Sequence, residues 1–569
     1  MKTFDTVAKL KLAKLKEGQF VETGGYYAKG DAGAARYLIV APQSFDGYGD
    51  HELANGNVAV LQHGEHTTVD NYGAVGTGDD SAAFQAYSNW ATAQLGMTTM
   101  RCGLNKEYTA TNVVITSNTA LNLNGCTISQ VADAGTAIFR NESTTDTHTE
   151  DNIFIYNGVL NGNTSAYTVD KQNFLISITS VHNFGIYDVT FENQRSINVG
   201  GGSSIALKIS GTSKFYTIDR CKFFRLGTTS ANGNGIFAQG SYATISNCIA
   251  DEVWDCPFNF ERMSHGVMTN NVATNSGVAF AVTLESENIA LSNNVSVTST
   301  TSGFLVDRFT HAGGTLMKNI ALTGNVSKNS GTTGVGNNFR IVDADKVTLL
   351  GNNSDTSNDS NIEVSNSSNI TVTGGQATNS TTKYGIFVQD CTNVNITDVD
   401  IYNQFSYGVF SWDTSSVVID GCKIHDTGEH QIRVKGGFFN TIKNNEVYDC
   451  KVAGQRAVFT DTAPDSLTIV NNNIYDTRVT ALQRGVQLDA SVTNAFYSDN
   501  YLHNLVVGNW FNDSATNTRG YVKLNTTANR PTLKEWDIGQ QYLDTTLAAA
   551  GKPIWWTGYS WVDGTGTSV

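Results

Sequence analysis

The stretch Ile236-Phe-Ala…Thr244-Ile-Ser-Asn247 decides the fold, because its pattern is repeated further along the chain. It recurs as Phe258-Asn-Phe…Val267-Met-Thr-Asn270-Asn271 and as Phe280-Ala-Val…Ile289-Ala-Leu-Ser-Asn293-Asn294. Each copy has a short apolar strand, a polar kink, a second strand and an Asn turn, and the turns recur about every 24 residues, a period typical of solenoids. The repeat predicts an all-β chain wound into a right-handed, single-stranded parallel β-helix, in which each coil buries its apolar residues by stacking on the next. Such coils present a long flat wall of outward side chains, which suits recognition of a long polymer.

Composition and charge narrow the classes of protein. The chain has 569 residues with 54 Gly and only 5 Pro, which fits stacked strands because proline removes ladder hydrogen bonds. The net charge of −15 argues against a nucleic-acid partner, which requires a basic face. Neither an apolar run long enough for a membrane span nor the apolar segment of a secretory signal occurs. The eight Cys have no metal-ligand spacing, so we interpret them as reduced thiols of a protein folded in a cytoplasm and expect no metal or other cofactor.

The chain is expected to divide into four segments. Residues 1–66 form a small module, and residues 67–110 open the β-helix with a helix that covers its unpaired strand edges. The coils fill residues 111–512. Residues 513–569 form a second small β module, which contains half of the Trp residues of the chain: Trp536, Trp555, Trp556 and Trp561.

Two local patterns concern the backbone. Asp80 or Ser81 is expected to cap the covering helix, whose apolar side then carries Ala83, Phe84, Tyr87 and Trp90. The Asn pairs of the repeat are interpreted as turn residues, because Asn tolerates left-handed backbone conformations and forms local hydrogen bonds.

Three stretches resemble a known family. Tyr72-Gly-Ala-Val-Gly-Thr-Gly-Asp-Asp-Ser-Ala-Ala-Phe-Gln85 is similar to the start of pectate-lyase-like β-helix proteins. Phe4-Asp-Thr-Val-Ala and Gly24-Gly-Tyr-Tyr look like the N-terminal module of phage tailspikes. Ile538-Gly-Gln-Gln-Tyr-Leu-Asp-Thr-Thr and Lys552-Pro-Ile-Trp-Trp-Thr-Gly-Tyr-Ser-Trp561 resemble C-terminal segments of phage tail proteins. The resemblance is to capsule depolymerases of podophages that infect encapsulated enterobacteria such as Klebsiella.

That resemblance implies a homotrimeric tailspike of the virion tail, made in the host cytoplasm and acting at the bacterial surface. It would bind and cut a capsular polysaccharide and attach to the phage tail, or to another tail fibre, through the N-terminal module. The C-terminal module would serve trimerisation, carbohydrate binding or both. No family motif covers the middle of the chain, so catalytic residues have to be argued from the repeat.

Stacked outward acids are the candidates for cutting a glycosidic bond, which requires two carboxyl groups beside the scissile bond. Glu261 follows the inward residues of one coil, Glu285 is expected at a similar place in the next, and Asp307 in the third. Neighbouring strands lie about 4.8 Å apart, so Glu261 and Glu285 would approach the spacing of a retaining pair, and Glu261 and Asp307 that of an inverting pair. Like-charge stacking would raise the pKa of one carboxyl.

Basic and aromatic residues accompany these acids. Arg262 and Arg308 directly follow two of them and would hold acidic sugars. His265 is a further catalytic candidate, since β-elimination from a uronic acid would use His265 with Arg262, or His311 with Arg308. Flat surfaces for sugar rings would come from Trp254 and Phe309.

Other acids compete, and hydrolysis and β-elimination remain open. The competitors are Asp413, Asp461, Asp489, Asp426 with Glu429 and His430, and Asp251, Glu252 and Asp255. Outward acids beside Arg are also common as simple surface ion pairs. The function hypotheses are a depolymerase, slightly favoured as a hydrolase, a non-catalytic adhesin that uses the same wall to bind, and a host-derived pectinolytic enzyme.

Overall fold

The computed structural model describes residues 1–143, 145–148, 150–163, 165, 173–194, 204–227, 233–309, 316–332, 336–462, 464–478, 483–505, 511–513, 519–520, 524–525, 541–544, 547, 552–557 and 559–569. The chain forms two units, residues 1–281 and residues 282–569, and each is described by itself. We call them the first unit and the second unit. Among the described residues, no helix is both long and apolar enough to cross a membrane.

The first unit begins with a small five-stranded sheet in the order β1-β2-β3-β5-β4. Its strands β1 and β2 are parallel and the other neighbours are antiparallel. Tyr37, Ile39 and Val58 form part of its buried core. The elements of this module are β1 (Lys2–Phe4), α1 (Val7–Lys11), β2 (Phe20–Thr23), β3 (Arg36–Val40), β4 (His51–Glu52) and β5 (Val58–Leu61).

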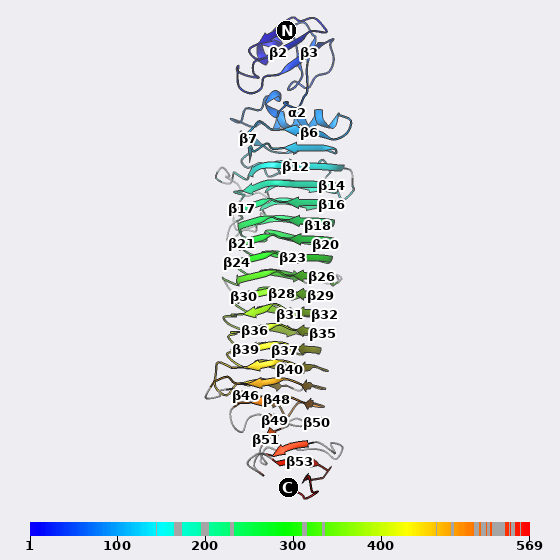
Figure 1. Ribbon diagram of the computed structural model, residues 1–569. Helices are drawn as coiled ribbons and strands as arrows, with labels where there is room; N and C mark the ends of the chain where they lie inside the picture. Colours follow the sequence, from blue (N-terminus) through cyan, green and yellow to red (C-terminus); the bar gives the residue numbers. More distant parts are fainter. Residues whose placement is uncertain are drawn as a thin grey trace. The chain divides into compact units, whose positions relative to one another are not determined.

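A 3-10 helix, η1 (Val69–Tyr72), and the helix α2 (Ser81–Thr92) precede the coils, as expected for a covering helix (Figure 1). Ser88 Oγ donates to the carbonyl of Val114 at 2.6 Å, and Phe84 packs edge-to-face on Tyr108 at 5.6 Å, which fixes α2 over the first coil. Asp80 occupies the N-cap position, but its side chain does not cap the helix. Its carboxylate accepts backbone N–H groups from Val75, Gly76 and Thr109 instead, so it ties the approach loop to a coil.

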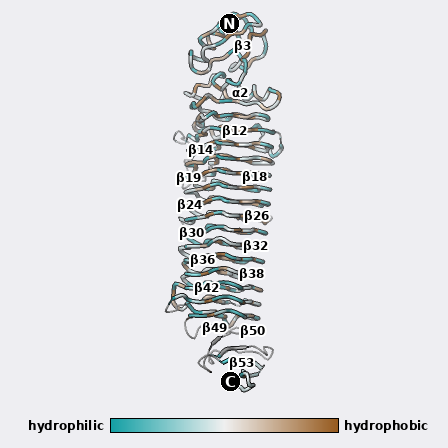
Figure 2. The backbone as a smooth tube through the Cα atoms, viewed as in Figure 1, coloured by the Kyte–Doolittle hydropathy of each residue, from teal (hydrophilic) through white to brown (hydrophobic). Residues whose placement is uncertain are grey.

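The coils of the first unit stack as parallel strands in register, as β12 and β14 do along nearly their whole length. Polar and apolar residues alternate along them (Figure 2). Inward rings also stack from coil to coil, for example Phe191 on Phe223 with centroids 4.9 Å apart. The strands are β6 (Thr98–Arg101), β7 (Glu107–Ala110), β8 (Val113–Val114), β9 (Thr119–Asn122), β10 (Thr127–Gln130), β11 (Phe139–Arg140), β12 (Glu150–Asn161), β13 (Asn173–Thr179), β14 (Val181–Glu192), β15 (Ser204–Ser210), β16 (Lys214–Asp219), β17 (Lys222–Leu226), β18 (Gly233–Ser246), β19 (Ile249–Val253), β20 (Phe258–Thr269), β21 (Val272–Ser276) and β22 (Phe280–Thr283), in which the unit ends.

The coils of the second unit are built from three strands, and each strand from β23 to β47 pairs in parallel with the third strand after it. These strands are β23 (Glu287–Ser292), β24 (Val295–Ser299), β25 (Phe304–Asp307), β26 (Met317–Thr323), β27 (Val326–Ser330), β28 (Phe339–Val342), β29 (Ala344–Leu350), β30 (Asn353–Ser357), β31 (Ile362–Ser365), β32 (Ser368–Thr373), β33 (Gln376–Thr378), β34 (Ile386–Gln389), β35 (Thr392–Thr397), β36 (Asp400–Tyr402), β37 (Val409–Trp412), β38 (Ser415–Asp420), β39 (Lys423–His425), β40 (Ile432–Lys435), β41 (Thr441–Lys443), β42 (Glu446–Tyr448), β43 (Arg456–Asp461), β44 (Thr468–Val470), β45 (Asn473–Tyr475), β46 (Arg484–Leu488), β47 (Phe496–Ser498), β48 (Tyr501–His503), β49 (Phe511–Asp513) and β50 (Arg519–Gly520).

The two residues of each Asn pair in the repeat have different structural roles. The first residue of a pair turns the chain, as Asn270 does with a φ of 56°. The second lies inside the coil: Asn294 is fully buried, and its N–H donates to the side-chain oxygen of Asn325 at 2.9 Å. Asn325 in turn donates to Asn352 in the next coil. The expected turn role is therefore confirmed for the first Asn, while the second builds a hydrogen-bonded ladder through the interior.

In each unit a residue with a left-handed backbone recurs at equivalent positions of successive coils, and we call these residues the corner row. In the first unit it contains Asn118, Asn152, Asn183, Phe215, Tyr242 and His265, and in the second Asn288, Asn319, Lys346, Asn369, Asn393, Ser416, Phe439, Ser466 and Asn494. Asn suits this conformation, whereas a bulky ring there costs free energy, about 1–2 kcal/mol per residue. Three successive coils of the first unit nevertheless carry rings.

All eight Cys are buried and free, which confirms the prediction of reduced thiols. In the C-terminal sheet, buried Trp561 packs with Ile554 and Trp556, so this Trp fills a core. Trp536 lies outside the described residues. The strands of this sheet are β51 (Leu524–Asn525), β52 (Gln541–Asp544), β53 (Lys552–Trp556) and β54 (Trp561–Asp563).

Candidate functional site

Glu261 faces outward from β20, because Phe258 and Phe260 on either side of Asn259 point into the core. Its Oε1 accepts a hydrogen bond from Gln239 Nε2 at 2.9 Å and pairs with Arg262 Nη1 at 3.1 Å. The Glu261–Arg262 pair expected from the sequence therefore forms. Since Glu261 neutralises the guanidinium, Arg262 is less available to an acidic sugar than the sequence suggests.

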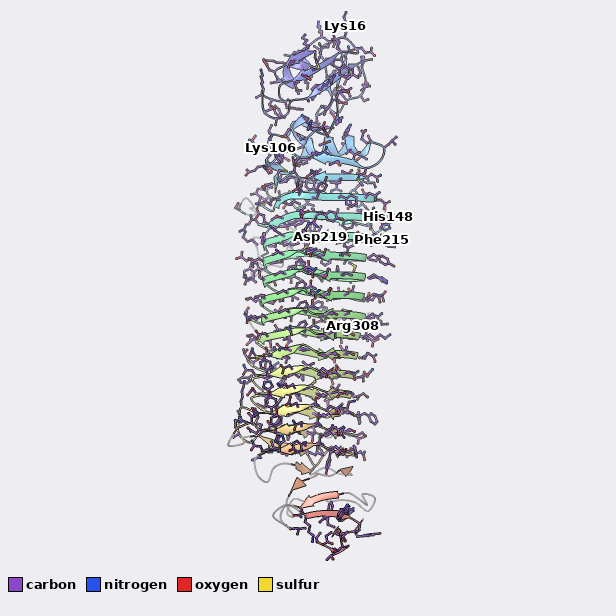
Figure 3. All side chains as sticks on the ribbon, in the orientation of Figure 1. Lys16, Lys106, His148, Phe215, Asp219 and Arg308 are labelled. Atoms are coloured by element: carbon purple, nitrogen blue, oxygen red, sulfur yellow. The ribbon has the colours of Figure 1, made fainter. Side chains whose placement is uncertain are left out.

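His265 lies in the corner row, exposed at the outer bend of β20. Its Nδ1 is 2.8 Å from Ser264 Oγ, and its ring stacks on Tyr242, which stacks on Phe215 at 4.9 Å. Phe215 projects from the side of the coils (Figure 3). Trp254 is half-buried in the turn after β19. Stacking of the three rings offsets part of the backbone cost at this corner.

Glu285 does not lie on a strand. The strand β22 ends at Thr283, and Leu284 and Glu285 both have left-handed φ values, so the exposed Glu285 side chain belongs to a turn. The sequence-based alignment assumed that the strand continues. Glu261 lies in the first unit, whereas Glu285 and Asp307 lie in the second. The distances expected between Glu261 and these two acids therefore stay predictions.

Asp307 ends β25 and begins an ion-paired cluster in the second unit. It is 7% exposed, accepts the N–H of Phe309 at 2.7 Å and lies 3.3 Å from Arg340 Nη1. Arg340 Nε is 3.8 Å from Glu363 Oε1. Burial raises the pKa of Asp307, although the Phe309 N–H and Arg340 oppose the shift. We call Asp307, Arg340 and Glu363 the acidic segment.

The partner of Asp307 differs from the expected one. Arg308 Nη2 is 3.7 Å from Asp343, so the Glu261–Arg262 arrangement is not repeated here. Arg308 is marked in Figure 3. Phe309 is exposed, with a left-handed φ of 44°. His311 lies outside the described residues.

Sequence reasoning named His430 and Asp461 as competitors but missed the second cluster to which they belong, further along the second unit. In β34, β37, β40, β43 and β46, and in the residues just before the first three of them, equivalent positions fall in rows because the strands are in register. One row consists of Tyr384, Tyr407, His430, Arg456 and Arg484. The next contains Phe387, Phe410, Arg433 and Phe459. We call Tyr407, His430, Arg433, Arg456 and Arg484 the cationic segment, and both segments together with their strands the wall.

Arg433 holds the centre of the cationic segment. Its guanidinium lies 4.9 Å from the ring of Phe410, donates to Tyr407 Oη at 2.5 Å and pairs with Asp461 Oδ2 at 2.5 Å. Lys435 Nζ lies 4.2 Å from the ring of Trp412. Stacked rings, cations and hydrogen-bonding edges are the groups that hold sugars and their charged substituents.

Burial sets the protonation of this segment. It raises the pKa of Tyr407 to about 12, helped by a hydrogen bond with Glu429, so the phenol is a donor and not a base. Burial also lowers the pKa of His430 to about 3, aided by the charges of Arg456 and Arg433. His430 Nδ1 accepts the N–H of Arg456 at 3.1 Å, as a neutral imidazole does.

The competing acids differ in their surroundings. Asp461 pairs with Arg433, while Asp489 accepts from Ser491 and keeps a lowered pKa. Asp426 is 2.8 Å from His425 Nδ1. Burial raises the pKa of Asp255. Asp413 and Glu252 are exposed with left-handed backbones, and Asp251 accepts from Thr274 and Asn275.

One group of described residues has metal-ligand chemistry that no spacing revealed. His148, Asp151 and His182 place a ligand atom each within 4.8 Å of one another. His148 lies at the edge of the coils (Figure 3). The two imidazoles are stacked at 3.6 Å and nearly parallel, so a metal in the plane of both rings requires one ring to turn. The group has no part in the function proposed below.

Comparison with known proteins confirms the fold. The family model "Right handed beta helix region" matches residues 311–474 and 360–526. No curated protein matches the sequence. The N-terminal fragment of bacteriophage Phi29 gene product 12 has a TM-score of 0.53 at 16% identity, over 80% of this chain and 91% of that chain.

Two further solved structures are less similar. A tailspike protein mutant of E. coli bacteriophage HK620, in complex with a hexasaccharide, has a TM-score of 0.44 at 12% identity, over 82% of this chain and 78% of that one. The A-module of the mannuronan C-5 epimerase AlgE6 of Azotobacter vinelandii has a TM-score of 0.38 at 16% identity, over 77% of this chain and 99% of that one. The chain has the fold of a right-handed parallel β-helix.

Proposed function

We propose that the protein is a phage tailspike that binds and depolymerises the capsular polysaccharide of its host. The observation that carries this proposal is the wall of the second unit. It combines a buried carboxyl of raised pKa with rows of buried and half-buried rings and half-buried guanidinium groups. A row of equivalent positions, repeated coil after coil, matches a polymer that presents the same chemistry again and again. The resemblances at both ends of the chain support the same assignment.

Asp307 is proposed as the general acid. Burial raises its pKa, which is the direction of shift that the acid of a carboxyl pair requires to donate a proton to the departing glycosidic oxygen. Glu363 is proposed as the second carboxyl, because Arg340 holds it on one oxygen and Asn337 Nδ2 donates to the other at 2.5 Å. In this role Glu363 would activate a water or attack the sugar.

The first unit offers a second candidate centre. Glu261 and His265 lie on the same strand, with Arg262 between them. His265 beside Arg262 is the arrangement that would serve β-elimination from a uronic acid. Asp307 is preferred as the acid because its carboxyl is the more deeply buried of the two strand acids.

The remaining assignments follow from the tailspike proposal. Residues 1–66 would attach the protein to the phage tail, and residues 513–569 would support a homotrimer. The wall would meet the capsule at the bacterial surface. Nothing in this proposal requires a nucleic acid, a membrane or a cofactor.

The test is incubation with a panel of purified capsular polysaccharides, with reducing ends and the ultraviolet absorbance of unsaturated uronates measured together. New reducing ends without absorbance are expected, and they indicate hydrolysis. If both signals rise, the enzyme is a lyase and the assignment moves to His265 with Arg262. Binding without cleavage on any polymer would replace the depolymerase by an adhesin.

A further inference from the structure

Arg456 and Arg484 are neighbours without an acid between them. They occupy the same position of β43 and β46, and the strands pair in register there. Both side chains are half-buried, and Arg484 Nε is buried without a hydrogen bond. Among the described residues, no carboxylate oxygen lies within 4.0 Å of either guanidinium group. Two like charges thus share a partly desolvated place on a protein of net charge −15.

The surroundings do not supply the missing negative charge. His430 is neutral, and Asp461 is engaged by Arg433 at 2.5 Å. The ring of Phe459 lies 5.4 Å from the Arg456 guanidinium. Burial and the charge of Arg484 lower the pKa of Arg456, so the pair is destabilised in the absence of an anion. A half-buried cation pair of this kind is stabilised when an anion completes it.

The other arginines of the candidate sites differ in this respect. Arg262 pairs with Glu261, Arg308 with Asp343, and Arg340 with both Asp307 and Glu363. These arginines are compensated within the protein. Only in the cationic segment, among the described residues of the wall, do two arginines occupy paired strand positions with no carboxylate in contact with either guanidinium group.

We propose that Arg456 and Arg484 bind the carboxylate of an acidic sugar, with the ring of Phe459 beside it. The proposal rests on the proposed function and names its substrate class: a capsular polysaccharide with carboxylate-bearing residues. Guanidinium groups bind carboxylates through two parallel hydrogen bonds, a geometry that lysine cannot reproduce. Neutralisation of this pair also lets an acidic polymer approach a chain that repels it elsewhere.

The first arm of the test uses small probes on the full-length protein. Sodium glucuronate is expected to raise the melting temperature of the wild type, glucose is not, and the Arg456→Gln/Arg484→Gln variant should respond to neither. Sodium phosphate at the same ionic strength separates a carboxylate site from a general anion site. An equal response to phosphate, or a response of the double variant to glucuronate, overturns the proposal.

The second arm uses the capsular polysaccharide that the wild type cleaves, before and after chemical reduction of its carboxylates to alcohols. The double variant is expected to bind the native polymer about 10-fold or more weakly than the wild type does, in line with the loss of charge-assisted hydrogen bonds. For the reduced polymer, wild type and variant should bind equally. Equal affinity of the wild type for both polymers would overturn the carboxylate assignment.

Matched variants keep the outcome interpretable. Arg220→Gln/Arg225→Gln removes the same two charges from exposed ion pairs of the first unit and should leave affinity unchanged. Arg456→Lys/Arg484→Lys keeps the charge without the fork and should recover only part of the affinity; full recovery would contradict bidentate binding. Cleavage without any effect of the double variant refutes this inference alone, whereas absence of cleavage and binding in the wild type refutes the proposed function.

Discussion

The two segments of the wall share a scaffold and differ in how their charges are completed. In the acidic segment, Arg340 lies between Asp307 and Glu363, so the protein neutralises its own cation. In the cationic segment, Arg456 and Arg484 lie side by side with no carboxylate of the described residues in contact. Charges that are paired within the protein hold their groups in place, which suits a reaction centre. Charges without a partner in the protein leave an interaction for the ligand to complete.

The largest effect is expected from removing the proposed acid of the acidic segment. Asp307→Asn removes the proposed acid and should lower the cleavage rate by on the order of 10²- to 10⁴-fold, the usual contribution of general acid catalysis. Initial rates of reducing-end release measure this. Affinity for the polymer should hold, since the cationic segment is untouched. Asp489→Asn is the matched control, because Asp489 has a lowered pKa and stays ionised. A rate for Asp307→Asn within 2-fold of the control would remove Asp307 from catalysis.

An effect of intermediate size is expected from pH, which should change cleavage by the acidic segment but not binding by the cationic segment. Because the pKa of Asp307 is raised, its protonated fraction falls as the pH rises through that pKa, and cleavage should fall by about 10-fold per pH unit above it. Binding should stay level between about pH 5 and 8, since guanidinium groups remain charged and His430, with a pKa of about 3, remains neutral. Rates and affinities measured side by side check this. A parallel fall of both would contradict the division of roles.

The smallest effect is expected in the corner row, where aromatic rings should change the stability of the protein but not its cleavage activity. Phe439 has a left-handed φ of 56° and is 65% exposed, so Phe439→Asn should stabilise the protein by about 1 kcal/mol. Phe215 has the same backbone but stacks on Tyr242, and the lost stacking, about 0.5–1.5 kcal/mol, should make Phe215→Asn nearly neutral. Thermal unfolding distinguishes the two. Altered cleavage in Phe439→Asn would show that the corner row contributes to the wall.

The fold was predictable from the sequence because it depends on local signals. The turn at Asn270 and the inward Phe258 and Phe260 follow from residue type and spacing alone. The buried ladder through Asn294 and Asn325 was not predictable, because an Asn after a turn looks the same whether its amide meets water or the next coil.

The candidate site was less accessible to sequence reasoning. Arg308 follows Asp307 directly, yet the backbone turns after the strand and sends the two side chains to Asp343 and Arg340. The row from His430 to Arg484 is hidden for a different reason: its residues are spaced further apart in each successive coil, as the loops lengthen. Only the strand register brings the two arginines together.

The buried thiols allow the unfolding of each unit to be followed by chemical labelling. The first unit carries Cys102, Cys126, Cys221, Cys248 and Cys256, and the second carries Cys391, Cys422 and Cys450, all shielded from water. Because a coil is held only by its neighbours, parts of a stack open before the whole does. A thiol-reactive label applied in short pulses would therefore mark the coils in the order in which they separate, with no engineered probe.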